Sequence, residues 1–306
     1  MQSNAVFSTK EYKTVGKRPI RHDGYEKVTG KALYGADIYP IGLLHAKVLR
    51  SPHAHAKIVS IDTSKAEAHQ DVRAVITAKD LSESNRCQEY PSGNKSDPNT
   101  NILARQKVLY KGHAIAAVAA ANPHVAEEAL SLINVVYEVL PAATNVEDAM
   151  RSQASRLHEE YEGNVANHTQ LKLGDVVQGF QKADVVVERE FRTKSVHQGY
   201  IEPHSATATW TTNDKITLWC SSQGHFQIGE ETAKALGIPV SMIKVVPMEI
   251  GGGFGGKTTI YLEPLAILLS RKSGQPVKAT MTRAEVLEAT GPTSGTYIKV
   301  KMGATQ

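Results

Sequence analysis

Apolar and polar positions follow a changing pattern along the chain. Residues 1–25 are polar and basic, and short apolar runs typical of strands then alternate with patterns typical of helices. The strands predicted in this first half span residues 43–49, 58–61, 72–77, 108–110, 114–119 and 135–140. Ser64 and Glu67 have capping-box spacing, and Asn122 followed by Pro123 predicts the start of a second helix. The alternation predicts a small α/β unit that ends near Pro141.

The second half begins with a polar stretch, residues 145–174, which reads as a linker or surface segment. Strands are then predicted at residues 184–193, 206–211, 216–221, 243–247, 277–281 and 297–302, and helices at 224–236 and 259–270. Gly237 is typical of a residue that ends a helix. The stretch 82–101 is rich in turn-forming residues, most clearly at 91–94, and is predicted to be a surface loop. The pattern therefore predicts a mixed α/β chain with domains at 20–142 and 165–306, joined by a linker at 143–164.

Composition limits the function classes. The 306 residues are too many for one small core, and 41% hydrophobic with 22% charged residues is typical of a globular protein. The formal charge of +4, without a dense Lys/Arg stripe, argues against nucleic acid as a partner. No apolar stretch is long enough for a membrane span, and the first residues lack the apolar core of a signal peptide. These features predict a cytoplasmic protein.

The chain has two cysteines, Cys87 and Cys220, far apart and outside any CxxC motif. This fits a reducing compartment and argues against a disulfide framework or a structural zinc site. An iron–sulfur cluster held by this chain alone is also excluded, because such a cluster normally needs four thiolates. Cys220 is interpreted as a small buried apolar residue rather than a metal ligand.

The most distinctive feature is a glycine run with one aromatic residue, followed by a lysine and a threonine. Its members are Gly251, Gly252, Gly253, Phe254, Gly255, Gly256, Lys257 and Thr258. Glycine loses the most backbone freedom on folding, so such a run indicates close approach of a ligand or another backbone. It follows a predicted strand and precedes a predicted helix, where exposed N–H groups favour an anion.

Two general motifs fit these letters. The stretch from Gly251 to Thr258 matches the P-loop pattern G-x-x-x-x-G-K-[ST], but neither following strand ends in the aspartate that a magnesium-binding P-loop protein needs. Gly251, Gly253 and Gly256 match G-x-G-x-x-G, but no acidic residue follows about 20 positions later. A P-loop NTPase remains an alternative, and the dinucleotide fold is weaker still.

A third interpretation takes in the neighbouring motifs. The glycine run resembles the GGGFGGK signature of the molybdopterin-binding subunits of the xanthine dehydrogenase/aldehyde oxidase family. Residues 198–203 resemble that family's Q-x-x-Y-x-E-P segment, with one residue fewer between the glutamine and the tyrosine, and residues 221–223 resemble its S-[ST]-Q segment. Residues 28–37, 51–58, 110–116 and 136–138 resemble its hammerhead domain. The resemblance covers the chain from about residue 17 and implies a hammerhead-like α/β domain followed by a truncated, α+β molybdopterin-binding domain.

The resemblance implies a molybdenum hydroxylase, which oxidises an N-heteroaromatic, an aldehyde or a related small molecule with oxygen derived from water. It assigns Gln223 as the catalytic residue that hydrogen-bonds an oxo ligand of molybdenum. It assigns cofactor contacts to Gln223, Gly252, Gly253, Phe254, Gly255, Gly256 and Lys257, with Lys257 either structural or near the pterin phosphate. Glu202, with His204 nearby, and Thr258 are expected on the substrate side. Purine-oxidising relatives have a glutamate after the loop lysine, so Thr258 argues against xanthine itself.

The family's cofactor is a molybdenum–pterin group, as molybdopterin or its cytosine dinucleotide form. The family's general-base glutamate lies in a later segment that is absent before Gln306. The resemblance therefore implies either a naturally split subunit, completed by a chain with the C-terminal molybdopterin domain, or a truncated product. Iron–sulfur clusters and FAD are implied on partner subunits. A scaffold subunit that binds no pterin is a non-enzymatic alternative.

Overall fold

The computed structural model describes residues 12–81, 88–89, 95–96, 101–159 and 161–306. The chain divides into two compact units, residues 1–33 and 34–306. The described part of the first unit holds one short helix, α1 (Gly24–Val28). Cys87 and the turn expected at 91–94 lie outside the described residues.

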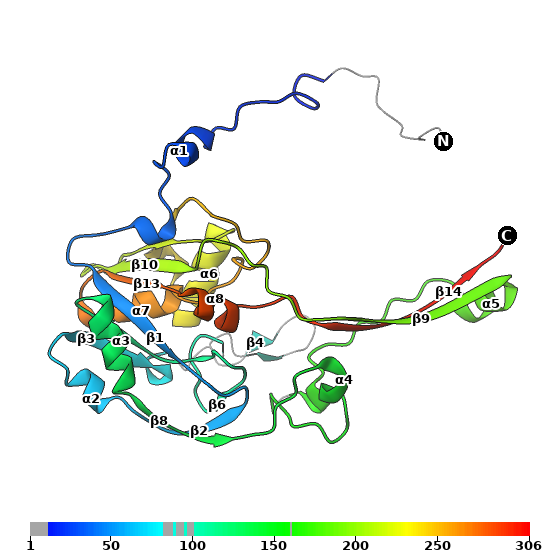
Figure 1. Ribbon diagram of the computed structural model, residues 1–306, viewed down its shortest axis with the longest axis horizontal. Helices are drawn as coiled ribbons and strands as arrows, with labels where there is room; N and C mark the ends of the chain where they lie inside the picture. The colour runs from blue at the N-terminus through cyan, green and yellow to red at the C-terminus, as the bar shows by residue number, and fades with distance from the viewer. Residues whose placement is uncertain (1–11, 82–87, 90–94, 97–100, 160) are drawn as a thin grey trace. The chain divides into compact units, whose positions relative to one another are not determined.

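A seven-stranded sheet forms the centre of the second unit (Figure 1). Its strands, in spatial order, are β12 (Ile243–Pro247), β11 (Ile216–Cys220), β10 (Ser205–Trp210), β13 (Val277–Thr280), β1 (Leu44–Arg50), β7 (Ala114–Ala120) and β3 (Val72–Thr77). β1 pairs with β13 in parallel, with Leu44 opposite Val277. The sheet is therefore continuous across the two ranges that the sequence assigns to separate domains. The boundaries at 20–142, 143–164 and 165–306 stay a prediction.

Helices cover both faces of this sheet. The long helices α6 (His225–Leu236) and α7 (Glu263–Ser273) pack against β12 and the central strands, while α3 (Pro123–Ser131) and α2 (Ser64–Glu67) lie against β1, β7 and β3. Every residue of β7 is buried, which follows from cover on both faces. Ala117 and Ala119 join the core under α7, whereas Ala116 and Val118 join the core under α3.

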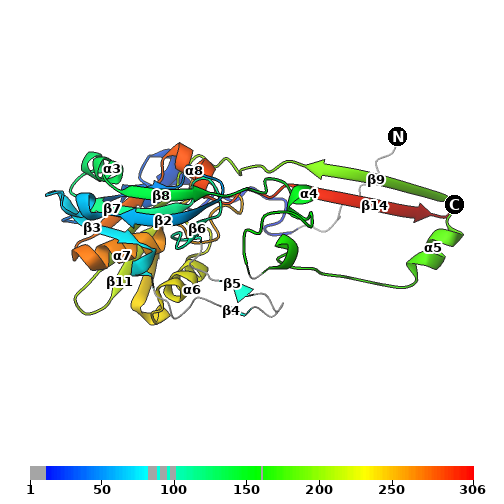
Figure 2. The same ribbon diagram turned by 90° about the horizontal axis from the view of Figure 1, so that it is seen from below.

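The remaining strands form three small sheets, seen from a second side in Figure 2. They are β6 (Lys107–Val108) with β2 (Ala56–Asp62) and β8 (Asn134–Val139), β4 (Gln88–Glu89) with β5 (Lys95–Ser96), and β9 (Val185–Thr193) with β14 (Thr296–Ala304). The other helices of the described part are α4 (Val146–Ala149), α5 (Val176–Lys182) and α8 (Arg283–Ala289), with 3-10 turns at Gly35–Asp37, Ala78–Asp80, Glu162–Asn164 and Val240–Met242. None of the described helices is long and apolar enough to cross a membrane.

The predicted mixed α/β fold is confirmed, with two local corrections. Asn122 caps α3 through its side-chain oxygen, as expected. The predicted capping box of Ser64 and Glu67 is wrong, because Thr63 occupies the N-cap position and its hydroxyl donates to Glu67 Oε1. The helix predicted from residue 259 begins at Glu263 instead, since that carboxylate accepts the backbone N–H groups of the two preceding residues.

Candidate functional site

The glycine loop, residues 251–257, follows β12 and lies against the segment 198–204 that leads into β10. Its backbone turns sharply, with Gly256 N–H donating to Gly253 O at 2.7 Å. Positive φ angles occur at Gly252 (95°), Phe254 (50°) and Gly255 (87°). Glycine adopts such angles without steric cost, whereas a phenylalanine there is uncommon and marks a constrained loop.

One side of the loop is packed against the protein and the other is open. An added Cβ at Gly251 would lie 2.6 Å from Glu202 Cβ, and one at Gly256 would lie 2.5 Å from Tyr200 Cε1. At Gly255 the same atom would meet nothing within 4 Å. The Phe254 side chain is 75% exposed. Gly251 and Gly256 thus allow the loop to pack closely against residues 198–204, and Phe254 and Gly255 form its free face.

Gln223 lies between β11 and α6, and its side chain binds the backbone of the loop. Its Oε1 accepts the backbone N–H groups of Gly255 at 3.0 Å and Lys257 at 3.2 Å. Its own backbone N–H donates to Lys257 O at 2.9 Å. The side chain is exposed, and its Nε2 donates no hydrogen bond to any part of the chain that the structure describes. Because the oxygen is fixed, the amide nitrogen is held with its two N–H groups available to a ligand.

Glu202 and Lys257 form an ion pair beneath the loop. Lys257 Nζ lies 2.6 Å from Glu202 Oε2, and the same oxygen accepts the N–H of Gly251 at 2.7 Å. The Lys257 side chain is fully buried, and that of Glu202 is 10% exposed. Burial lowers the pKa of Lys257, and its hydrogen bond to Glu202 counteracts part of that effect.

A buried polar cluster continues behind this pair. Tyr200 Oη lies 2.7 Å from His204 Nε2 and 3.1 Å from Thr290 Oγ1. His197 Nε2 approaches the same threonine hydroxyl at 2.8 Å. Burial lowers the pKa of His204 to about 3, and the positive charge of Lys257 acts in the same direction. The imidazole is therefore neutral and serves as a hydrogen-bonding group.

The geometry of the loop disfavours the P-loop interpretation. A P-loop lysine must reach the phosphates of the nucleotide, but Lys257 points to Glu202 and is buried. Thr258, which would ligate magnesium, donates its hydroxyl to Gly255 O at 3.0 Å. The helix begins only at Glu263, so the lysine is not in a first helical turn.

Cys220 lies at the end of β11 and is fully buried. Burial raises the pKa of its thiol, so it stays protonated and is a poor metal ligand. Within the described ranges, no group of three or more His, Cys, Asp or Glu side chains could hold a metal ion.

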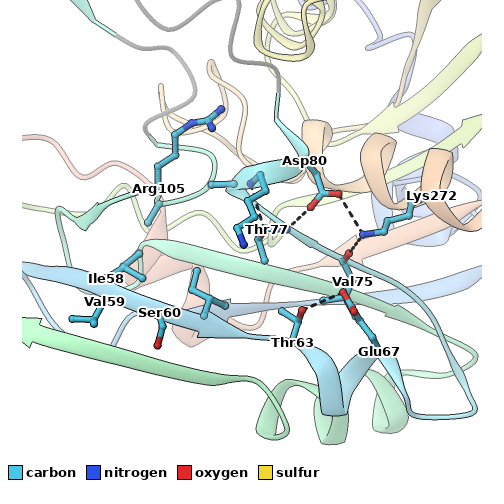
Figure 3. A pocket seen from close by; sticks show the side chains of 14 residues that line it. Ile58, Val59, Ser60, Thr63, Glu67, Val75, Thr77, Asp80, Arg105 and Lys272 are labelled. Atoms are coloured by element: carbon cyan, nitrogen blue, oxygen red, sulfur yellow. Dashed lines mark hydrogen bonds and ion pairs between the residues drawn. The ribbon is translucent and has the colours of Figure 1, made fainter.

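A cavity of about 590 Å³ lies elsewhere, beside β2 and β3 (Figure 3). Two of its charged side chains contact each other: Lys272 Nζ lies 3.3 Å from Asp80 Oδ1 and also donates to Val75 O at 2.6 Å. Thr63 donates to Glu67 at 3.1 Å. None of the residues that line it belongs to the glycine loop, so this cavity is separate from the candidate site.

Comparison with known proteins matches both halves of the chain. Residues 157–306 match the family model of the molybdopterin cofactor-binding domain, and residues 29–141 match that of the aldehyde oxidase and xanthine dehydrogenase a/b hammerhead domain. The nicotinate dehydrogenase large molybdopterin subunit of Eubacterium barkeri is 33% identical over 298 residues, which cover 97% of this chain and 68% of that protein. The chain belongs to the xanthine dehydrogenase/aldehyde oxidase family. The motifs predict this family, and its members named here are molybdopterin or molybdenum-binding subunits of oxidoreductases.

Other members of this family extend the match. A probable xanthine dehydrogenase subunit of Bacillus subtilis (strain 168) is 37% identical over 285 residues, which cover 93% of this chain. The crystal structure of quinoline 2-oxidoreductase from Pseudomonas putida 86 superposes with a TM-score of 0.87 at 29% identity over 96% of this chain. The chain spans only 37% and 38% of the lengths of these two proteins.

The structure also adds residues to the candidate site that the sequence motifs did not indicate. Tyr200 belongs to the motif at residues 198–203, but only the structure shows its contacts with His204 and Thr290. Arg283 on α8 donates to the carbonyl oxygens of Tyr200 and Ile201, and no sequence signal pointed to it. Gln223 and the loop are brought together, whereas the side chain of Glu202 is turned to the loop backbone and Lys257.

Proposed function

We propose that the chain binds the molybdenum–pterin cofactor at the face formed by Gln223, Phe254 and Gly255, as part of a molybdenum hydroxylase complex. The observation that carries the proposal is the orientation of Gln223. Its oxygen is bound to the loop, and its amide nitrogen is free to donate. Beside it, Gly255 presents an open face where an added Cβ would meet nothing within 4 Å. These residues fit a group that carries oxygen acceptors and approaches the backbone closely.

When bound, the cofactor supplies the redox chemistry that oxidises a substrate carbon with oxygen from water. The protein contributes position. Gln223 would donate an amide N–H to an oxygen of the cofactor, with its orientation set in advance by its two bonds to the loop. Phe254, 75% exposed, would cover apolar surface of the cofactor or substrate and exclude water there. The binding roles of Gly252, Gly253, Gly256 and Lys257 are to shape the loop that presents these groups.

The proposed substrate is an N-heteroaromatic compound, an aldehyde or a related small molecule. Thr258 supports this class, because it offers an uncharged hydroxyl, already bound to Gly255 O, where a glutamate would grip a purine. Two of the similar proteins are named for nicotinate and quinoline, both N-heteroaromatic compounds. Glu202, expected on the substrate side, has its Oε2 bound within the protein.

The proposed partners are an iron–sulfur subunit, a FAD subunit and, for a naturally split subunit, a polypeptide that carries the rest of the molybdopterin domain. The β9–β14 ribbon supports the last of these. Strand alternation gives it one charged face and one mainly apolar face. This apolar face carries Arg189 and the exposed apolar side chains of Val185, Val187, Phe191, Ile298 and Met302. A two-stranded ribbon is marginally stable alone in water, so this face fits a complementary polypeptide.

The test is metal and pterin analysis of the complex purified from its native host through a tag on this chain. We expect molybdenum in amounts close to stoichiometric with the chain, together with pterin and co-purifying iron. Gln223→Ala should lower the molybdenum content, whereas Gln227→Ala, on the exposed face of α6 where Gln227 bonds Glu231, should leave it unchanged. An intact complex that holds neither molybdenum nor pterin overturns the proposal and favours a scaffold role.

A further inference from the structure

The two ends of the glycine loop meet at a single carboxylate oxygen. Glu202 Oε2 accepts the backbone N–H of Gly251 at 2.7 Å and lies 2.6 Å from Lys257 Nζ. Glu202 also donates its own backbone N–H to Gly251 O at 3.3 Å. The first and last residues of the loop are therefore tied to one residue outside it.

Burial makes the two charges depend on each other. The Lys257 side chain is 0% exposed and that of Glu202 is 10% exposed. The second carboxylate oxygen of Glu202 is buried without a hydrogen-bond partner in the described part of the chain. Loss of either partner would leave a buried, uncompensated charge, which is far more costly than loss of an exposed one.

Lys257 links this pair directly to Gln223. Its side chain binds Glu202, while its backbone N–H donates to Gln223 Oε1 and its carbonyl oxygen accepts the Gln223 backbone N–H. A displacement of Lys257 must therefore move one of the two hydrogen bonds that orient the Gln223 side-chain amide, together with the bond that holds the Gln223 backbone. The loop is short, so the same displacement reaches Gly255.

The support behind the pair is itself held in place. Lys257 Nζ lies 5.0 Å from the centre of the Tyr200 ring, and Tyr200 is almost completely buried. Arg283 donates to the carbonyl oxygens of Tyr200 and Ile201, which fixes the segment just before Glu202 to α8. The carboxylate is thus presented to the loop from a rigid base.

We propose that Glu202 and Lys257 are positioning residues, whose buried ion pair closes the glycine loop and sets the direction of Gln223, Phe254 and Gly255 toward the cofactor. Neither charged group lies on the free face of the loop, so the pair acts through the backbone. This inference rests on the proposed function for the nature of the ligand. The closure of the loop itself belongs to this chain and is measurable without the cofactor.

The test compares Glu202→Gln, Lys257→Met and the double variant in the full 306-residue chain. Amide hydrogen exchange is followed in a peptide covering residues 248–258. We expect each single variant to speed exchange in that peptide roughly tenfold or more. It removes a hydrogen bond to a charged group and leaves the charge of the other residue unpaired. If the two substitutions acted independently, their effects on the exchange rate would multiply in the double variant. We expect the double variant to exchange more slowly than that product, because neither charge is left unpaired.

The same variants are then analysed in the assembled complex for molybdenum and pterin, which should fall in step with the faster exchange. Glu263→Gln is the matched control: Glu263 is also buried and accepts two backbone N–H groups, those of Tyr261 and Leu262, but it contacts no residue of the glycine loop. It should leave exchange in 248–258 unchanged.

Unchanged loop exchange in both single variants overturns the inference. So does a general loss of stability in which the loop exchanges no faster than the rest of the chain, because that result identifies a purely structural pair. If the wild-type complex holds no molybdenum or pterin, the proposed function fails, and the exchange data still decide whether the pair closes the loop.

Discussion

At the scale of single residues, the glycines of the loop serve different purposes. Gly253 has an ordinary φ, but an added Cβ would lie 2.4 Å from Gln223 Oε1. Gly255 has the opposite requirement, since its φ is 87° and the space beside it is open. One position is glycine because a side chain approaches it, and the other because the backbone turns there.

This difference predicts the behaviour of Gly253→Ala. The atoms in the way are Oε1, Cδ and Cγ of the exposed Gln223 side chain, which can move aside by giving up its two hydrogen bonds to the loop, so the free energy of unfolding should fall by about 1–3 kcal/mol. Cofactor binding should suffer, because Gln223 then loses its bonds to Gly255 and Lys257. Urea denaturation of the chain and molybdenum analysis of the complex measure the two effects.

Gly255→Ala is the comparison: strain at its positive φ should cost about 1–2 kcal/mol without displacing Gln223. Full molybdenum content in Gly253→Ala would contradict the role of Gln223.

A second prediction at this scale concerns His204. Its pKa of about 3 lies below the value of about 6.5 expected in an unfolded chain, so between these values only the unfolded state binds the proton. The folded state is then fully stabilised above pH 6.5 and loses up to about 1.4 kcal/mol per pH unit on acidification toward pH 3. Burial disfavours protonation of the imidazole, and the positive charges of Lys257 and Arg50 act in the same direction.

Urea denaturation at pH 7 and pH 5 measures this dependence. His204→Gln keeps an acceptor for the Tyr200 hydroxyl and cannot titrate, so its unfolding free energy should fall less on acidification than that of the wild type. His168→Gln, at an exposed position, should retain the wild-type slope. Equal slopes for wild type and His204→Gln would show that His204 is protonated in the folded state near its ordinary pKa.

At the scale of secondary structure, local patterns were sufficient where the signal was local. The strand at Ala114–Ala120, the cap at Asn122 and the helix end at Gly237 follow from residue types and short spacings, and the structure has all three. The helix α8 was missed, although Thr282 and Glu285 form a capping box. Its seven residues are too few for a helical period to stand out against the strands around it.

Long-range pairing is the part that the sequence did not reveal. Nothing in the local pattern of β1 indicates that Leu44 pairs with Val277, or that Thr193 pairs with Thr296 in the ribbon. The candidate site shows the same limit. Gln223, Glu202 and the glycine loop were found through their motifs, but their contacts depend on the order of strands β10, β11 and β12 in the sheet. The ion pair of Glu202 and Lys257 joins residues 55 positions apart.

At the scale of the whole molecule, the β9–β14 ribbon contacts α4 and α5 on its charged face and leaves the side chains of its apolar face exposed. In both views it extends away from the seven-stranded sheet, and every residue of β9 is exposed (Figures 1 and 2). Charged side chains pair across one face, as in Lys299 with Glu190 and Lys301 with Glu188. The other face is mainly apolar, and we infer that the rest of the molybdopterin domain covers it in the complex.

Val186 and Val187 provide a matched test of this assignment. They are neighbours on β9 and equally exposed, at 44% each, but strand alternation directs them to opposite faces, with Val187 on the apolar one. Val187→Lys and Val186→Lys should each change the unfolding free energy of the isolated chain by no more than about 0.5 kcal/mol, since both positions are at the surface.

Val187→Lys should weaken association with the polypeptide carrying the rest of the domain roughly tenfold or more, because a lysine there must be desolvated without a partner. Val186→Lys should associate as the wild type does. Co-purification from a strain expressing both polypeptides, followed by titration, measures the difference; equal affinity for the two variants would place the interface away from the apolar face of the ribbon.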